Sequence, residues 1–198
     1  MLNYNSLTYL YLRIHRRIWN ILFRSNFKSF GDSTIAFPWK IRGAQFIEIG
    51  DNVNILSKIW LDANKIDDNS PQIVIGDRTR INRYSTISAV KEVRIGKDVI
   101  IGERSYLSDN THEYENIELP IRDQPIKFNN SVYIGDESWL GANVTILGAK
   151  VGKHCVIGVN SIVTKDIPDY SVAIGAPAKV IKKYNFDKGI WERVTEDI

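Results

Sequence analysis

The chain has very few of the residues that build disulfides and metal sites. Its 198 residues include one cysteine, Cys155, and three histidines. A single cysteine excludes an internal disulfide and fits a reducing compartment. Because Cys155 lies inside a regular apolar pattern, we interpret it as a small buried side chain rather than a reactive thiol.

Long apolar runs and a strong charge of one sign are also missing. No segment has the length and apolar character to span a bilayer, and the N-terminus lacks the apolar stretch of a secretion signal, so we expect a cytoplasmic protein. The formal net charge of +3 is small and dispersed, which argues against a nucleic-acid partner. With 43% hydrophobic and 25% charged residues, the composition fits one folded domain with a sizeable core.

What the chain does have is an apolar residue at every sixth position. Ten of its thirteen glycines directly follow Ile, Leu or Val. A six-residue period fits neither a helix nor a flat strand, but it fits a chain wound into a triangular prism with one hexapeptide on each face. The apolar runs are Ile49, Ile55 and Leu61; Ile75, Ile81, Ile87 and Val93; Ile95, Ile101 and Leu107; Ile134, Leu140 and Ile146; and, after a shift of one residue, Val151, Ile157 and Val163. The sequence therefore predicts an all-β parallel β-helix in which equivalent aliphatic side chains stack into a continuous core.

The first thirty residues depart from this repeat. They carry apolar residues at spacings of three or four, basic residues and no acid, which predicts an amphipathic helix over residues 1–30. The apolar positions are Leu7, Leu10, Ile14, Ile18 and Ile21. We favour a cap that covers the open end of the prism. The alternative is attachment to an anionic membrane face, which a basic helix without acids permits.

Two further segments interrupt the repeat. Residues 62–72 are polar, and because no His or Cys accompanies their carboxylates we expect a solvated excursion and no metal. Residues 108–131 lose the hexapeptide phase and predict an arm that projects from the prism. His112 opens this arm a few residues after a repeat strand, so the prism fixes its position. We interpret His15 and His154 as exposed bystanders.

Several segments together resemble the left-handed β-helix acetyltransferases, a family that includes galactoside, maltose, xenobiotic and polysaccharide O-acetyltransferases. The resemblance covers about residues 45–183 and rests on DNTHEYENIELPI, YIGDESWLGANVTIL and VIGVNSIVTKDIPDYSVAIGAPAKVIKKY. It implies an all-β, left-handed parallel β-helix with an N-terminal helical cap and a protruding loop. The organisation would be an amphipathic helical segment over 1–30, an acyltransferase domain over 31–183 with its arm at 108–131, and a tail over 184–198.

The resemblance implies acetyl transfer from acetyl-CoA directly to a hydroxyl. His112 matches the family's catalytic histidine, and a neutral imidazole suits removal of a hydroxyl proton near pH 7. Asp109, Glu115 or a backbone carbonyl could hold the other ring nitrogen, and we rank Asp109 slightly first. Direct transfer needs no covalent enzyme intermediate, so Cys155 is not required as a nucleophile.

The resemblance also implies a coenzyme groove between neighbouring copies and therefore a homotrimer. Residues near the thioester would be Trp139 and Ala142, and backbone contacts to the pantetheine arm would come from Val159 and Asn160. Phosphate contacts would come from Thr164, Lys165, Lys179 and Lys182, with Pro177 near the adenine. Lysine at the last two positions, where the galactoside-type members favour arginine, would weaken bidentate phosphate recognition.

The acceptor expected from the resemblance is a sugar or a bacterial surface polysaccharide. Asn82, Arg83 and Tyr84 are candidate sugar contacts, with exposed corner residues as the alternative interpretation. Rival functions are an N-acetyltransferase acting on an amino sugar nucleotide, a xenobiotic acetyltransferase and a non-catalytic scaffold. A carbonic anhydrase of this fold would need three metal-binding histidines, which three scattered histidines do not supply.

Overall fold

The computed structural model describes residues 4–66 and 68–194, except for the side chains of residues 4–9, 12, 15 and 16. The interpretation of His15 and part of the predicted apolar helix face, Leu7, therefore concern side chains outside the described residues. The tail expected over 184–198 is described as far as residue 194.

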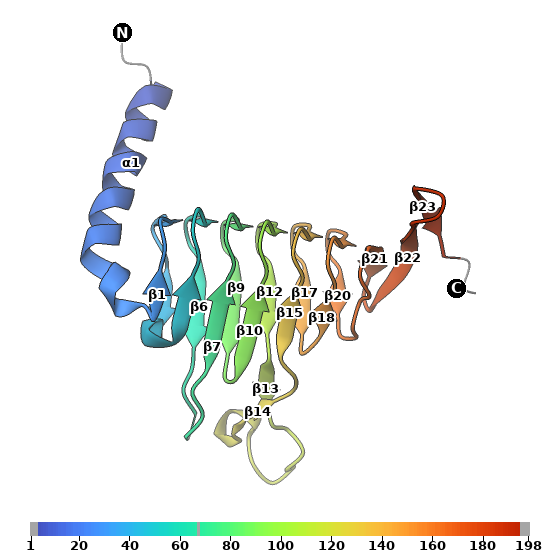
Figure 1. The fold of residues 1–198 in the computed structure, drawn as a ribbon. Helices are drawn as coiled ribbons and strands as arrows, with labels where there is room; N and C mark the ends of the chain where they lie inside the picture. Colours follow the sequence, from blue (N-terminus) through green and yellow to red (C-terminus); the bar gives the residue numbers. More distant parts are fainter. Residues whose placement is uncertain (1–3, 67, 195–198) are drawn as a thin grey trace.

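Three parallel sheets form the faces of a triangular prism (Figure 1). Face A contains β1 (Ser29–Phe30), β4 (Ile47–Ile49), β7 (Gln72–Ile75), β10 (Glu92–Ile95), β15 (Val132–Ile134) and β18 (Lys150–Val151). Face B contains β2 (Thr34–Ile35), β5 (Asn54–Ile55), β8 (Arg80–Ile81), β11 (Ile100–Ile101), β16 (Trp139–Leu140), β19 (Val156–Ile157) and β21 (Ser171–Gly175). Face C contains β3 (Lys40–Arg42), β6 (Trp60–Ala63), β9 (Thr86–Ala89), β12 (Tyr106–Ser108), β17 (Thr145–Leu147) and β20 (Ile162–Val163). Each coil runs from face A to B to C, and we name the corners between them edges AB, BC and CA.

The repeated aliphatic side chains point into the prism. Ile101 is in register with Ile81 on one side and Leu140 on the other, and all three are fully buried. Between Ile146 and Val151 the apolar repeat advances by five residues instead of six. The backbone accommodates this shorter spacing at Gly148, whose φ of 53° lies in the left-handed region that favours glycine. The predicted all-β parallel β-helix and its stacked core are confirmed.

Antiparallel strands close the C-terminal end of the prism. β22 (Ala178–Asn185) pairs with β21, and β23 (Ile190–Arg193) pairs with β22. Because these strands extend face B, the last coil has no open parallel edge on that face.

The N-terminal helix contacts the prism through Tyr11, whose ring stacks on that of Phe37 at 6.0 Å, and through its last turns. α1 (Tyr4–Phe23) continues into the short helix η1 (Arg24–Asn26), and its N-terminal part extends beyond the prism (Figure 1). Trp19 packs against Phe27 and Phe30, and Asn20 donates a hydrogen bond to the carbonyl of Ser33. The helix covers the end of the prism with its last turns, so the predicted cap is partial. Of the helices within the described residues, none has both the length and the apolar character needed to cross a bilayer.

Two insertions leave the prism at edge CA (Figure 1). The first begins later than the expected residue 62, because Asp62 and Ala63 belong to β6. Asp62 is buried and accepts a hydrogen bond from Arg42 Nη2 at 2.7 Å, so it is not part of a solvated loop. The second insertion is the arm, in which β13 (Asn110–His112) pairs antiparallel with β14 (Ile126–Phe128). Two short 3-10 helices complete the fold, η2 (Ala44–Phe46) and, in the arm, η3 (Ile121–Asp123).

Candidate active site

His112 is the last residue of β13 and is exposed. Its strand is paired with β14 through Asn110 opposite Phe128 and His112 opposite Ile126, so a two-stranded ribbon holds the imidazole away from the prism. Among the residues that the structure describes, none hydrogen-bonds to the imidazole. The ring is therefore available to an acceptor or to a second copy of the chain.

Asp109 does not hold His112. Its side chain is fully buried, and its two oxygens accept the backbone N–H groups of Val90, Lys91 and Glu92 at 2.7–2.9 Å. Asn110 Nδ2 also donates to Asp109 Oδ1 at 2.8 Å. The expectation that Asp109 orients the imidazole is not met, because its carboxylate is committed to the turn between β9 and β10. Glu115, the other acidic candidate, lies 3.4 Å from Lys127 Nζ.

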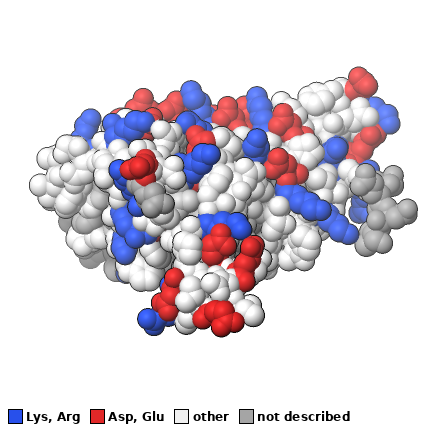
Figure 2. Space-filling model, turned by 90° about the horizontal axis from the view of Figure 1, so that it is seen from below, with Lys and Arg blue, Asp and Glu red and all other residues white. Residues whose placement is uncertain are grey.

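The arm beyond His112 carries more acidic than basic residues. Its acids include Glu113, Glu115, Glu118 and Asp123, against Arg122 and Lys127. Figure 2, which views this side, shows several red acidic side chains on the arm, and both acidic and basic side chains along the prism. Lys127 lies within 3.5 Å of both Glu113 and Glu115, and these charges raise its pKa. A partner that receives the arm would therefore need to offer basic or hydrogen-bond-donating groups.

Several candidate residues stack along edge BC. Backbone hydrogen bonds run down this edge from coil to coil, from the Asn160 amide to the Ala142 carbonyl at 3.0 Å and from the Arg104 amide to the Arg83 carbonyl at 3.0 Å. Between them, the Asn143 amide donates to the Glu103 carbonyl at 2.8 Å. The sugar candidates at 82–84 therefore lie two coils from Ala142 on the same edge. Tyr84 is exposed with a φ of 61°, and the guanidinium of Arg104 lies 5.9 Å from its ring centroid.

Face B beside this edge is apolar. Trp139 lies in register between Ile100 and Val156, and its side chain is 52% exposed. Val159, at the adjoining corner, is 63% exposed. Trp139 is therefore not part of the core, and the exposed strip has the apolar character of a surface that another molecule covers.

The remaining candidates lie toward the C-terminal coils. Thr164 and Lys165 follow β20 at edge CA, and both are exposed. Pro177, Lys179 and Lys182 lie in or next to β22, where Lys179 is opposite Ile174 and Lys182 is opposite Val172. Within the described part of the chain, none of the three lysines forms an ion pair. They are cations without an internal partner, as a phosphate site requires.

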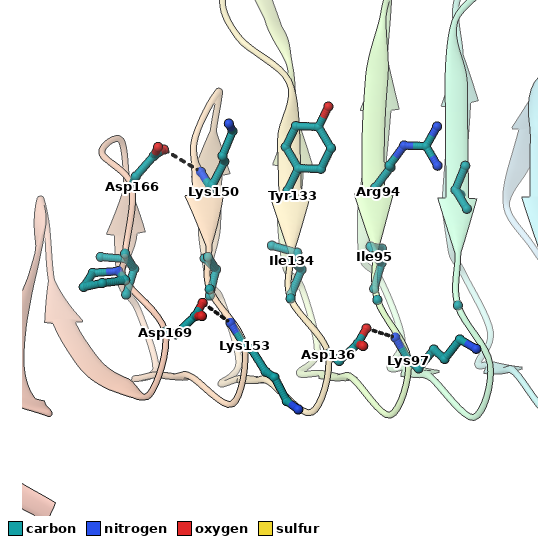
Figure 3. Close-up of a pocket in the computed structure, with 18 residues that line it drawn as sticks. Arg94, Ile95, Lys97, Tyr133, Ile134, Asp136, Lys150, Lys153, Asp166 and Asp169 are labelled. Carbon is teal, nitrogen blue, oxygen red and sulfur yellow. Dashed lines mark hydrogen bonds between the residues drawn. The ribbon is translucent and has the colours of Figure 1, made fainter. Parts of the chain in front are cut away.

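The structure also contains a groove that sequence reasoning missed. It has a volume of about 790 Å³ and lies on the outer side of face A. Figure 3 shows Arg94, Tyr133 and Lys150 projecting from neighbouring strands, while Asp136 and Asp169 accept the backbone amides of Lys97 and Lys153 at 2.8 Å. Both aspartates lie at edge AB, where each of these hydrogen bonds joins one coil to the next. Asp136 belongs to the repeated Gly-Asp corners. No predicted site residue lines the groove, and the only sequence signal was the repeated Gly-Asp corner.

The described residues include no candidate metal centre, and the cysteine is poorly placed to act as a nucleophile. Within the described residues, no group of three or more His, Cys, Asp or Glu side chains is arranged to hold a metal ion. Cys155 is buried with its Sγ 3.1 Å from the carbonyl of Pro168, and burial raises the pKa of its thiol. A raised pKa disfavours the thiolate that a nucleophile would need.

Comparisons with known proteins agree with this architecture. Residues 131–179 match the family described as the hexapeptide repeat of succinyl-transferase. The chain is 34% identical over 166 residues to the putative lipopolysaccharide biosynthesis O-acetyltransferase WbbJ of Escherichia coli, covering 80% of this chain and 83% of that protein. It is 37% identical over 137 residues to a probable acetyltransferase of Mycobacterium tuberculosis, a match that covers 69% of this chain but only 44% of the relative's length.

Solved structures share the fold at low sequence identity. A variant of AntD, an N-acyltransferase from Bacillus cereus in complex with dTDP and coenzyme A, gives a TM-score of 0.70 at 20% identity, covering 83% of this chain and 88% of that chain. PerB from Caulobacter crescentus, in complex with CoA and GDP-perosamine, gives 0.56 at 21% identity, covering 75% and 56%. These likenesses confirm the predicted left-handed β-helix. With the identity to WbbJ over most of both chains, they lead to the conclusion that this chain belongs to the hexapeptide-repeat acetyltransferase family.

Proposed function

We propose that the chain is an acetyl-CoA-dependent O-acetyltransferase that acts on a hydroxyl of a sugar or a bacterial surface polysaccharide. The observation that carries the proposal is His112, an exposed imidazole on a paired ribbon in a member of this family. Two relatives are named for O-acetylation: WbbJ, and the galactoside O-acetyltransferase of Lactococcus lactis, 33% identical over 141 residues. A cytoplasmic site of action belongs to the same proposal, since acetyl-CoA is a cytoplasmic metabolite.

In this mechanism His112 acts as general base. A neutral imidazole takes the hydroxyl proton while the acceptor oxygen attacks the thioester carbonyl carbon. The carbon–sulfur bond then breaks, and the proton passes from the imidazolium to the leaving thiolate of coenzyme A. Buried Cys155 takes no part, because acetyl passes directly from donor to acceptor.

The proposed coenzyme site follows the exposed strip beside edge BC. Trp139 and Val159 offer apolar surface to the pantetheine arm, and Ala142 and Asn160 offer corner backbone. The phosphates would meet the unpaired cations of the C-terminal coils, with Pro177 beside the adenine. The residues assigned to the phosphates are Thr164, Lys165, Lys179 and Lys182.

A homotrimer would complete the site. His112 leaves the prism at edge CA, whereas Ala142 and the sugar candidates Asn82, Arg83 and Tyr84 lie along edge BC. Cyclic packing of three prisms would bring edge CA of one copy to edge BC of the next, so that each site takes its base from one copy and the apolar coenzyme strip from another, while Thr164 and Lys165 lie on the edge that carries the base. The acidic arm of one copy would then face the exposed arginines of that edge, among them Arg83 and Arg104.

The second candidate is an N-acetyltransferase acting on an amino sugar nucleotide. It is favoured by the shared fold with AntD and PerB, whose structures contain dTDP and GDP-perosamine. The two functions differ in the nucleophile, so acceptors that carry only hydroxyls separate them from acceptors that carry an amine.

The test is acetyl-CoA consumption against a panel of saccharides and amino sugar nucleotides, with mass analysis of the product. We expect His112→Ala to lower kcat by about two to four orders of magnitude, as for loss of a general base, while coenzyme binding measured by calorimetry persists. His154→Ala is the matched control, because His154 is exposed at edge AB. Unchanged turnover in His112→Ala would remove the mechanism, and an acetylated amine as the product would establish the second candidate.

The coenzyme site has its own test. Lys165→Glu should raise the KM for acetyl-CoA through repulsion of the phosphates, whereas Lys65→Glu, the same change in an exposed loop, should leave it unaltered. An unaltered KM in Lys165→Glu would show that the nucleotide of the coenzyme binds elsewhere.

A further inference from the structure

The outer face of α1 is apolar and uncovered. Leu10, Ile14, Ile18 and Ile21 are between 50% and 76% exposed, although spacings of four, four and three place them on one face. We call these four residues the α1 stripe. A contiguous apolar stripe in solvent marks an interaction surface.

The α1 stripe faces away from the prism. The helix is attached through Tyr11, whose ring stacks on Phe37, through Trp19, whose ring lies 6.2 Å from that of Phe27, and through Asn20. At 3.6 residues per turn, these three contacts span roughly one half of the helix circumference, and the stripe residues lie on the other half, roughly 100–180° around the axis from Trp19. The prism therefore leaves the stripe half or more exposed.

One flank of the α1 stripe is positively charged. Arg13, Arg17 and Arg24 are exposed, and helical geometry puts them within about 40° of one another around the axis. None of the three forms an ion pair with a described residue. The chain contains no acid before Asp32, so the charge of the helix is uncompensated.

These charges favour one occupant over another. Two copies of α1 packed stripe to stripe would bring like charges together with no acid to pair them. An anionic lipid surface offers phosphates to the arginines and an acyl boundary to the stripe. Trp39, 76% exposed at the same end of the prism, lies two residues from Phe37, whose ring stacks on Tyr11 of α1 at 6.0 Å. An exposed indole in that position suits a membrane interface.

We propose that α1 lies in the plane of an anionic lipid surface, with its stripe in the acyl boundary and its arginines at the headgroup phosphates. Figure 1 shows that the N-terminal part of the helix extends beyond the prism, and the stripe residues are exposed, so a bilayer can reach the stripe without displacing the coils. The proposal does not rest on the acetyltransferase proposal, which is tested with free acceptors in the absence of lipid.

The experiment is flotation of the full chain with vesicles of phosphatidylglycerol and phosphatidylcholine, against vesicles of phosphatidylcholine alone. We expect binding to the anionic vesicles that falls as salt rises. Arg17→Gln should weaken it about fivefold, the effect of one basic residue near an anionic surface. Lys65→Gln, the same change away from α1, should have no effect. Ile18→Gln should also weaken binding, because it removes apolar surface from the stripe.

Three results would overturn the proposal. The first is equal binding to both kinds of vesicle, and the second is anionic binding that Arg17→Gln and Ile18→Gln leave unchanged. The third is absence of vesicle binding together with a change of molar mass by light scattering in Ile18→Gln, which would assign the stripe to a second copy of this chain. Circular dichroism of both variants checks that the helix persists, and the exposed Arg17→Gln change gives a result even where Ile18→Gln perturbs folding.

Discussion

Replacing Asp109 by Asn separates a structural role from a catalytic one. The carboxylate is fully buried and accepts three backbone N–H groups and the side-chain amide of Asn110. Asparagine keeps one acceptor oxygen and turns an N–H toward donors on the other side, so about two of these hydrogen bonds are lost. Hydrogen bonds to a charged group contribute about 1.5–3 kcal/mol each, and because two of the three backbone donors are only partly buried we expect a loss of about 3 kcal/mol.

The assay measures the Tm and the kcat of each variant at one protein concentration. For a chain of this length, about 3 kcal/mol corresponds to a fall in Tm of roughly 6–12 °C. Asp136→Asn is the matched control, because Asp136 is exposed and accepts one backbone amide, that of Lys97, at 2.8 Å. The Asp136→Asn substitution should lower the free energy of unfolding by less than about 1 kcal/mol. Below the Tm of the variant, kcat of Asp109→Asn should stay within a few fold of the parent. Unchanged stability with a large fall in kcat would refute this reasoning and restore Asp109 as the residue that orients the imidazole.

Three other substitutions or reactions test the prism. Ile101→Ala should lower the free energy of unfolding by about 2–5 kcal/mol in urea, because the side chain is fully buried between coils; a loss below about 1 kcal/mol would contradict the stacked core. Gly102→Ala should lower the Tm, since a Cβ there would come within 2.4 Å of the Gly141 carbonyl carbon; an unchanged Tm would mean that the coils can move apart at no cost. Cys155 should react with a thiol reagent at pH 8 far more slowly in the folded protein than in urea, because burial raises the pKa of its thiol; equal rates would place it at the surface.

The core was predictable because a repeat reports backbone geometry directly. A six-residue period assigns the repeated aliphatic side chains to the inside of a coil, and Ile81, Ile101 and Leu140 lie in register as predicted. The break after Ile146 was also visible, but only the structure shows that a left-handed Gly148 absorbs it. In a repeat fold, local periodicity shows which side chains lie inside the coils, so no long-range strand pairing has to be predicted.

The arm was predictable in extent but not in contacts. Loss of phase at Ser108 marks where the chain leaves the prism, yet outside the repeat no pattern says where a side chain turns. Asp109 and His112 are three residues apart, and the turn sends the carboxylate back to the β9–β10 backbone while the imidazole goes outward. Asp109 carried no sequence signal of this commitment, because a turn-forming Asp and a buried amide acceptor look the same in one sequence.

The helix shows the same limit. Apolar spacing predicted α1, but it assigned the apolar face to the end of the prism. Trp19 makes that contact instead, and Ile14, Ile18 and Ile21 remain exposed. Amphipathicity indicates that a face will be covered, and only packing shows by what.

The division of the candidate site between two edges has a mechanical consequence. Backbone hydrogen bonds of 2.8–3.0 Å join the edge BC corners from Arg83 to Asn160, so Ala142 and Asn160 cannot move toward edge CA without breaking the coil. His112 is held by its own pairing with Ile126. Since neither group can travel around a rigid prism, the proposed chemistry, which uses both, would depend on a neighbouring copy. A substitution on the arm that weakens assembly should then lower kcat without altering the fold of the single chain, and activity should follow the fraction of assembled protein on dilution.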